Sequence, residues 1–187
     1  MSQQLDFPDT VPELLGHLVY LRELTEADVP AWYERATDAE SAALAGDPIP
    51  ESIEMGFQWL ERNRERFRQH TSIRWAIVPK GSTHSVGSIG LTIKSQEERI
   101  AELGFVIGRA SWGKGMGTSA AHLVTRYAFD TLGLAEIRAE LLQSNVASRR
   151  VLEKVGFQFQ CVIPDFEQSD AGSEDGYLYV LQGPTAG

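Results

Sequence analysis

The sequence is poor in the residues that mark several classes of protein. Its 187 residues include one cysteine, Cys161, and four histidines that are scattered along the chain. A single cysteine forms no internal disulfide, and no Cys/His cluster has the spacing of a zinc site. No apolar run approaches the ~20 residues of a membrane span, and residues 1–13 lack the basic-then-apolar order of a secretory signal. We therefore expect a cytoplasmic protein that binds no metal and contacts no membrane.

Basic residues are also scarce. The chain carries 17 Lys and Arg against 26 Asp and Glu, which gives a net charge of −9. Nucleic-acid binding needs basic clusters that neutralise phosphates, so no nucleic acid is expected as a partner. An acidic chain is compatible with a cationic partner, although most of its carboxylates are expected only to keep the surface hydrated. The sequence is also compatible with a homodimer.

What is present fits a single α/β (α+β) domain. The length and the 42% share of hydrophobic residues are enough for one buried core. We expect residues 1–16 to be a loosely held lead-in, residues 17–183 to form the domain, and residues 184–187 to be a tail. Alternating patterns predict strands at 17–24, 73–78, 85–93, 100–107, 136–142, 157–163 and 177–181, and helices after Thr25, at 52–69, 115–131 and 145–155.

The connections between these elements predict the sheet. The middle strands are joined by short turns and should pair antiparallel, whereas the helix at 115–131 should cross over to a parallel neighbour. The expected fold is a mixed, mostly antiparallel sheet of six to seven strands with helices on both faces.

The most informative segment is a glycine-rich stretch between an apolar strand and a run of helix formers. Gly113, Gly115 and Gly117 lie two apart at the expected start of the helix 115–131. Free backbone N–H groups and the positive end of the helix dipole attract phosphate oxygens there. Glycine lets a phosphate approach the backbone, and Lys114 adds a mobile positive charge. We interpret this segment as a cradle for a diphosphate.

Several known loops compete for this interpretation. Residues 108–114 fit the first seven positions of a nucleotide-binding P-loop, but the eighth is Gly115, where Ser or Thr would hold Mg²⁺. A dinucleotide fingerprint would need glycine where Thr118 stands. A glycine turn that caps a helix and binds nothing is the plainest alternative.

Three ordered segments resemble one family. Gly113-Lys114-Gly115-Met116-Gly117 resembles the acyl-CoA pyrophosphate loop of the GNAT superfamily of N-acetyltransferases, Gln/Arg-x-x-Gly-x-Gly/Ala, with Trp112 in place of the Gln/Arg. Asn145–Phe157 resembles the Asn-x-x-Ser-x-x-x-Leu-x-x-x-Gly-Phe signature of the ribosomal-protein alanine N-acetyltransferase (Rim-type) branch. Val19–Asp28 is similar to the Leu-x-Leu-Arg-x-x-x-x-x-Asp start of that branch.

The resemblance implies transfer of an acetyl group from acetyl-CoA to a primary amine in a ternary complex, without a metal. It implies that the parallel strands 100–107 and 136–142 splay apart in the middle of the sheet and hold the pantetheine arm. The backbone of residues 113–118 would take the pyrophosphate, Asn145 would contact the pantetheine, and Arg149 or Arg150 would reach the 3′-phosphate. Asn145 is equally well explained as a helix N-cap. The implied cofactor-binding residues are Phe105, Val106, Ile107, Gly113, Lys114, Gly115, Met116, Gly117, Thr118, Asn145, Arg149 and Arg150.

Two residues are candidates for the proton chemistry. Glu102 stands in a segment similar to the family's Glu-Ile/Leu-Gly-Tyr/Phe strand, and some members use this Glu as general base. A solvent-facing Glu at the start of a strand is the alternative. Many members carry a Tyr that protonates the thiolate at the position of Leu152, and leucine cannot do so. Ser148 is the nearest hydroxyl in the motif, although a helical serine more often bonds its own backbone.

The acceptor is less defined by the sequence. The resemblance places its site among the helices at 26–69 and the segment 165–175, whose five carboxylates would hold a cationic acceptor or merely hydrate a mobile hairpin loop. A protein N-terminal amine and a small amine, such as a polyamine or aminoglycoside, are both candidates. The alternatives to an enzyme are a catalytically weak acyl-CoA-binding or interaction protein and, more distantly, a P-loop nucleotide binder.

Overall fold

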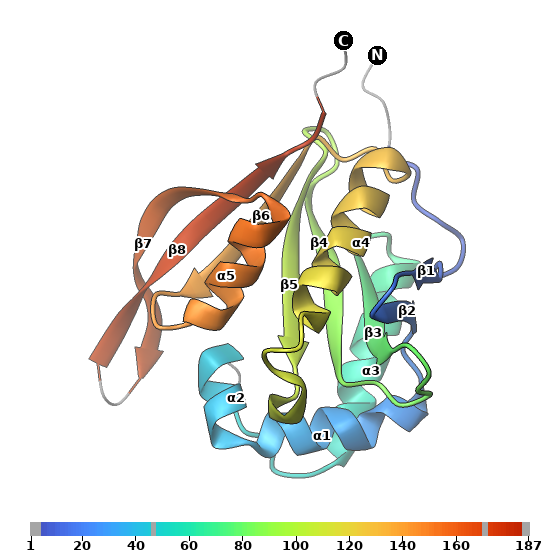
Figure 1. The fold of residues 1–187 in the computed structure, drawn as a ribbon, viewed down its shortest axis with the longest axis vertical. Helices are drawn as coiled ribbons and strands as arrows, with labels where there is room; N and C mark the ends of the chain where they lie inside the picture. The colour runs from blue at the N-terminus through green and yellow to red at the C-terminus, as the bar shows by residue number, and fades with distance from the viewer. Residues whose placement is uncertain (1–4, 46–47, 170–171, 185–187) are drawn as a thin grey trace.

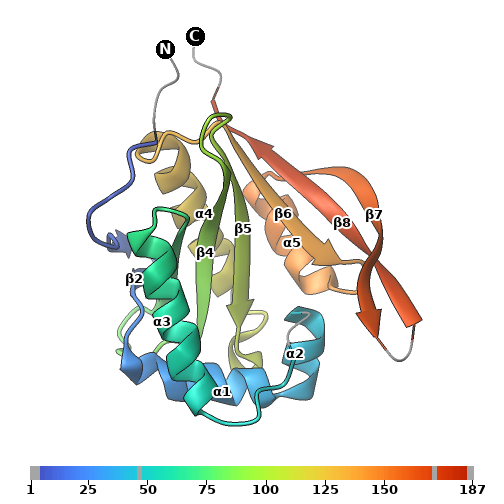
Figure 2. The ribbon, with the colours of Figure 1, turned by 180° about the vertical axis from the view of Figure 1, so that it is seen from behind.

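The computed structural model describes residues 5–45, 48–169 and 172–184, and these form one eight-stranded sheet with helices on both faces (Figures 1 and 2). The strand order is β1-β2-β3-β4-β5-β6-β8-β7, and only β5 and β6 pair in parallel. The strands are β1 (Leu14–Leu15), β2 (Val19–Glu23), β3 (Ser72–Pro79), β4 (Gly87–Ser95), β5 (Ile100–Ile107), β6 (Glu136–Leu142), β7 (Gln158–Ser169) and β8 (Gly172–Gln182). The predicted mixed, mostly antiparallel sheet is confirmed.

Five α-helices of the described chain cover the two faces of the sheet. They are α1 (Val29–Thr37), α2 (Ala39–Ala45), α3 (Glu54–Arg68), α4 (Met116–Asp130) and α5 (Val146–Val155). Figure 1 shows α4 and α5 in front of the sheet, and Figure 2 shows α3 in front of the opposite face. Within the described ranges, no helix is both long and apolar enough to cross a membrane.

Strand alternation divides the core between the two faces. Trp75 and Ile77 of β3 are fully buried in the larger cluster, together with residues of α4. Ala76 and Val78, which point the other way, pack with Leu60 of α3 in a smaller cluster. The α3 side therefore has less apolar packing, and this is the side on which a polar cavity opens.

The sheet splits between β5 and β6. Their parallel pairing is limited to three residue pairs, from Ile100 opposite Glu136 to Glu102 opposite Arg138. Beyond Glu102, β5 continues to Ile107 while β6 diverges from it (Figure 2). The predicted splayed pair is confirmed. Because Gly108 donates its N–H to Val86 on the β4 side (2.8 Å), alternation directs the backbone groups of Leu103, Phe105 and Ile107 toward the gap.

The N-terminal segment departs from the expected lead-in. Residues 1–4 lie outside the described residues, but residues 5–16 are packed onto the domain. Leu5 is buried, Leu14–Leu15 pairs with β2, and the indole Nε1 of Trp75 donates to the carbonyl of Pro12 (2.8 Å). The apolar side chains of this segment thus hold it against the core despite its prolines. A two-residue strand is too short to show alternation, which is why the sequence predicted at most seven strands.

The acidic segment also differs from the expected loop. β7 and β8 pair through it, from Gln158 opposite Val180 to Ser169 opposite Gly172. Asp170, Ala171 and the tail residues 185–187 lie outside the described residues. Glu174 accepts a hydrogen bond from the Ser144 N–H (2.7 Å) instead of facing only solvent. Most of these carboxylates therefore belong to a long hairpin, which extends beyond the apolar residues that predicted its strands.

Asp28 anchors the start of the helices on the α3 face. Thr25 and Asp28 form a capping box: the Thr25 N–H donates to Oδ2 of Asp28 (2.8 Å) in a 3₁₀ turn at Glu26–Asp28. Arg22 adds two hydrogen bonds to the same carboxylate (2.8 and 2.9 Å). Burial by itself would raise the pKa of Asp28, but hydrogen bonds from Arg22, Ser85 and Thr25 outweigh it and leave the pKa lowered.

Replacing Asp28 by Asn is expected to lower the free energy of unfolding by about 3 kcal/mol near pH 7, because the Arg22 guanidinium loses its buried partner. A carboxyl with a lowered pKa stabilises the fold above its ordinary value of 3.8 and loses this effect as pH falls through the folded-state pKa. The difference between the two proteins in urea unfolding should therefore shrink in acid. The exposed Glu26→Gln variant is the control, with a change within about 0.5 kcal/mol. A difference that does not vary with pH would contradict the ionic explanation.

Candidate functional site

The start of α4 carries the glycine loop and a set of free backbone donors. Gly113 and Gly115 have positive φ values of 72° and 76°, which glycine adopts without strain. The first helical hydrogen bond runs from the Ser119 N–H to the Gly115 carbonyl (3.0 Å). Across the described chain, the N–H groups of residues 113–118 donate to no backbone carbonyl. Six donors without a backbone partner therefore lie together at the positive end of α4.

The third glycine of the loop has a different role, which is close packing. A Cβ on Gly117 would lie 3.2 Å from Cδ1 of Ile107 and 3.4 Å from Cγ2 of Val151. The absence of a side chain thus lets the first turn of α4 rest against β5 and α5. By contrast, a Cβ on Gly113 would have no heavy atom within 4 Å, so the loop backbone is open in front.

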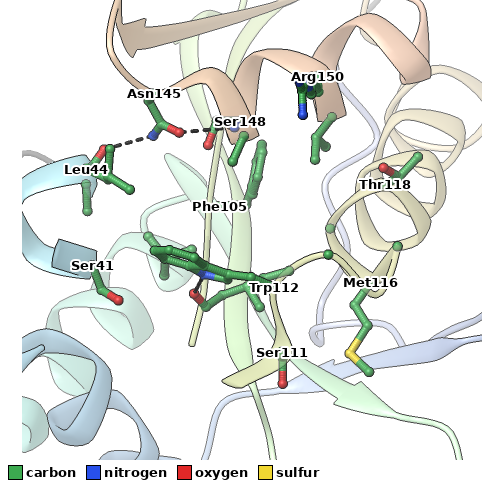
Figure 3. Close-up of a pocket in the computed structure, with 18 of the residues that line it drawn as sticks. Ser41, Leu44, Phe105, Ser111, Trp112, Met116, Thr118, Asn145, Ser148 and Arg150 are labelled. Carbon is green, nitrogen blue, oxygen red and sulfur yellow. Dashed lines mark hydrogen bonds between the residues drawn. The ribbon is translucent and has the colours of Figure 1, made fainter. Parts of the chain in front are cut away.

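A first cavity of about 310 Å³ lies beside this loop, between α4, α5, β5 and the end of α2 (Figure 3). It brings together most of the residues that the sequence singled out for cofactor binding, but neither Lys114 nor Arg149. The predicted residues that line it are Phe105, Val106, Ile107, Gly113, Gly115, Met116, Gly117, Thr118, Asn145, Ser148 and Arg150. Arg149 lies 3.9 Å from the Glu153 carboxylate, within its own helix.

Asn145 ties two walls of this cavity together. Its Oδ1 accepts a hydrogen bond from the Ser148 N–H (3.0 Å), which caps α5. Its Nδ2 donates to the carbonyl of Leu44 (2.9 Å), at the end of α2 (Figure 3). The N-cap interpretation is therefore confirmed, and the side chain also positions α2 over the gap.

Several residues of this cavity were not predicted from the sequence. Trp112 lines it and donates its indole Nε1 to the Ile107 carbonyl (2.7 Å), which fixes the loop against the end of β5. Lys154 lines it together with Arg150, one helical turn away. The i, i+4 spacing of these two cations was the available signal. No spacing pattern in the sequence indicated that Ser41 and Leu44 of α2 would line the cavity.

A second cavity, of about 490 Å³, opens on the α3 side of the sheet. Glu102 and Gly104, which share one face of β5, line it. The two cavities share lining residues in the gap between β5 and β6, so they approach each other through the split sheet. The shared residues are Arg35, Leu44, Ala45, Phe105, Val106, Asn145 and Ser148.

Two carboxylates lie near this junction. Glu102 forms an ion pair with Lys94 (2.7 Å). Glu140 lies on β6 two residues beyond Arg138, the partner of Glu102, and therefore on the same face of the sheet. Although Glu140 is an exposed residue, partial burial of its carboxyl raises its pKa, the negative charge of Glu102 raises it further, and Lys94 and Arg138 oppose the shift. Glu140 was not among the residues predicted from the sequence.

The site combines a phosphate cradle at the start of α4 with the gap between β5 and β6. Within the described residues, no group of three His, Cys, Asp or Glu could hold a metal ion. An anion cradle at a helix N-terminus, continuous with a gap between splayed parallel strands that have free backbone groups, is the arrangement of an acyl-CoA-dependent transferase. The open loop at Gly113 fits the approach of this cofactor's phosphates.

Comparison with known proteins identifies the family. Residues 19–158 match the family described as Acetyltransferase (GNAT) domain. The chain belongs to this family and is an acetyl-CoA-dependent N-acetyltransferase.

Relatives and solved structures agree with this assignment. The chain is 29% identical to the uncharacterized N-acetyltransferase YoaA of Bacillus subtilis, over 92% of this chain and 98% of that protein. A GNAT-family acetyltransferase from Bacillus anthracis superposes with a TM-score of 0.80 at 20% identity, covering 91% of this chain and 98% of that one. The RimJ protein of Mycobacterium smegmatis, solved with CoA-disulfide, gives a TM-score of 0.79 at 22% identity over 96% of this chain and 90% of that one. The fold of the Rim-type branch is therefore shared.

Proposed function

We propose that the enzyme acetylates a primary amine, either a protein N-terminal amine or a small amine, by direct attack within a ternary complex. The observation that carries this proposal is the approach of two cavities to each other through the gap between β5 and β6. One cavity contains the phosphate cradle, and the other contains carboxylates that attract an ammonium group. Two substrates that enter from opposite faces of the sheet would meet at Phe105, Val106 and Ser148.

The first cavity would bind acetyl-CoA through backbone groups and two cationic side chains. The N–H groups of residues 113–118 would bind the pyrophosphate. Arg150 and Lys154 would lie near the 3′-phosphate. Beyond the last residue pair with β6, the backbone groups of Phe105 would bond the amides of the pantetheine arm, as a neighbouring strand would. Acetyl-CoA supplies an activated acetyl thioester.

The acceptor side would supply the proton chemistry. An ammonium group must lose a proton before its nitrogen can attack the acetyl carbonyl. We assign this proton to the pair formed by Glu102 and Glu140, with Glu140 as the group that takes it, because Lys94 engages Glu102. As the nitrogen–carbon bond forms, the carbon–sulfur bond breaks. The nitrogen loses a second proton as the amide forms, and the Ser148 hydroxyl, which belongs to a residue that lines both cavities, would relay that proton to the departing thiolate.

The test combines binding with turnover. Calorimetry with acetyl-CoA, CoA and ATP should show binding of the first two and none of ATP. Release of free thiol from acetyl-CoA should then accelerate with at least one member of a panel of peptides with free N-termini, polyamines, aminoglycosides and amino acids. Binding of acetyl-CoA without amine-dependent thiol release across the panel would instead favour an acyl-CoA-binding protein.

A further inference from the structure

The second cavity separates charges of opposite sign. Four of the chain's 17 Lys and Arg residues line it, although the chain as a whole is acidic. These arginines come from α1, α3 and β3: Arg35, Arg62, Arg66 and Arg74. The carboxylates that line the same cavity, Glu102, Glu140 and Glu167, come from β5, β6 and β7. A molecule in this cavity would therefore face arginines from the elements α1, α3 and β3 and carboxylates from the strands β5, β6 and β7.

Helix α3 directs one stripe of its surface into the cavity. Trp59, Arg62, Asn63 and Arg66 line it, and their spacing of three and four residues places them on one face of the helix. Neither Arg62 nor Arg66 forms an ion pair with any carboxylate in the described ranges.

Two other arginines of α3 behave differently. Arg68 pairs with Glu61 and with Glu65 (both 2.7 Å), and Arg64 lies 3.7 Å from Glu61. These pairs are exposed, and neither arginine lines the cavity. Helix α3 thus carries two arginines that pair with its own acids and two exposed arginines that line the cavity without such an ion pair.

Two glycines, which have no side chains, leave room for the side chain of Arg74 at the surface of the sheet. This residue is opposite Gly90 of β4, which is opposite Gly104 of β5. A Cβ on Gly104 would lie 3.8 Å from Nη2 of Arg74, so the guanidinium extends across β4 as far as β5. Its Nη1 donates to the Ser88 hydroxyl (3.3 Å). A cation is thereby fixed in the strand row next to Glu102.

We infer that the acceptor is a small molecule that carries an anionic group, a carboxylate or a phosphate, in addition to its primary amine. This inference rests on the proposed function. The ammonium end lies toward Glu102 and Glu140, and the anionic end lies toward Arg62 and Arg66 of α3. Guanidinium groups bind carboxylate and phosphate by paired, charge-assisted hydrogen bonds. A cavity of about 490 Å³ is in the range of small-molecule sites.

Matched acceptors test this inference. Glycine, β-alanine, 4-aminobutyrate and 6-aminohexanoate would each be compared with the corresponding amide, and phosphoethanolamine with ethanolamine. For at least one chain length or for the phosphate pair, kcat/KM should favour the anionic acceptor by about 10-fold or more, since a hydrogen bond to a charged group contributes that much. The carboxylate and phosphate arms distinguish the two anions. Equal or better use of all the neutral acceptors would overturn the inference.

The variant Arg62→Gln/Arg66→Gln locates the anion site. It should lower kcat/KM for the preferred anionic acceptor about 10–100-fold and leave the neutral partner within about threefold. The control Arg64→Gln/Arg68→Gln, on the same helix, should retain the preference. A preference that survives in the first variant would overturn the assignment of the anion to α3.

Binding gives a second readout that does not depend on turnover. Calorimetry of each acceptor pair in the presence of CoA should show the same ratio of affinities, and the same loss in Arg62→Gln/Arg66→Gln. If no amine is acetylated, the proposed function fails. The ratio of affinities still decides whether the arginines select an anion.

Discussion

Replacing Glu140 by Gln is expected to reduce kcat for amine acetylation by about 10²–10⁴-fold at neutral pH, the usual contribution of a general base. The amide keeps the shape of the side chain but cannot accept the proton of the acceptor. Glu140 is the exposed position of the otherwise buried or half-buried strand β6, so the fold should tolerate the change. The measurement is steady-state thiol release, with calorimetry of acetyl-CoA as a check that the cofactor site is intact.

Glu102→Gln is the informative partner variant. The Glu102 charge raises the pKa of Glu140, so its removal should lower that pKa. The carboxylate then stays ionised to lower pH. The acid limb of kcat/KM, expressed per unprotonated amine, should therefore shift to lower pH while activity near neutrality is largely kept. If Glu102→Gln abolishes turnover and Glu140→Gln does not, Glu102 is the base.

The largest expected effect on cofactor binding comes from Gly117→Val. The branched side chain would overlap Ile107 and Val151, which already lie within 3.4 Å of the position of a Cβ. The first turn of α4 must then move from β5, and the donors of residues 113–118 no longer converge. We expect the Kd for CoA to rise by about 100-fold, equivalent to roughly 3 kcal/mol, with a loss of stability of about 1–3 kcal/mol.

Two further variants separate the loss of CoA binding in Gly117→Val from a general loss of stability. Gly117→Ala meets mainly the flexible end of Ile107 and should weaken CoA binding about 10-fold or less. Ser119→Ala, in the same first part of α4 but outside the first cavity, should bind CoA as the native protein does. Calorimetry and thermal unfolding provide both readouts. Unchanged CoA affinity in a folded Gly117→Val protein would show that the cradle does not depend on this packing.

Local patterns predicted most of the fold. Glycine, proline and capping residues mark element ends, so helices such as Val146–Val155, between Asn145 and Gly156, were predicted closely. The exceptions were elements that tertiary contacts stabilise. The two-residue strand Leu14–Leu15 exists because its neighbours pack on the core. The ends of β7 and β8 are polar, and pairing between the two strands holds them extended.

The cofactor side of the site could be predicted from the sequence, whereas the acceptor side could not. The phosphate cradle is encoded in consecutive residues, 113–118, so its chemistry was visible in the sequence. The acceptor cavity combines Arg35, Arg62, Arg74 and Glu140, which are far apart in the chain and meet only through the register of the sheet. Arg149 and Arg150 are adjacent, yet the helix turns only Arg150 toward the cofactor cavity. The residues of the acceptor cavity, and the choice between Arg149 and Arg150, could therefore not be predicted from the sequence.

The short pairing between β5 and β6 makes the sheet a structure of two wings. One wing comprises β1 to β5 and the other comprises β6 to β8, and only three residue pairs link them along the strands. A ligand that bonds to both edges would act as a missing strand that ties the wings together. A bound ligand at 100 times its Kd adds about 2.7 kcal/mol to the stability of a protein. We therefore expect the free energy of unfolding of this enzyme to increase with the concentration of acetyl-CoA, the substrate that it consumes.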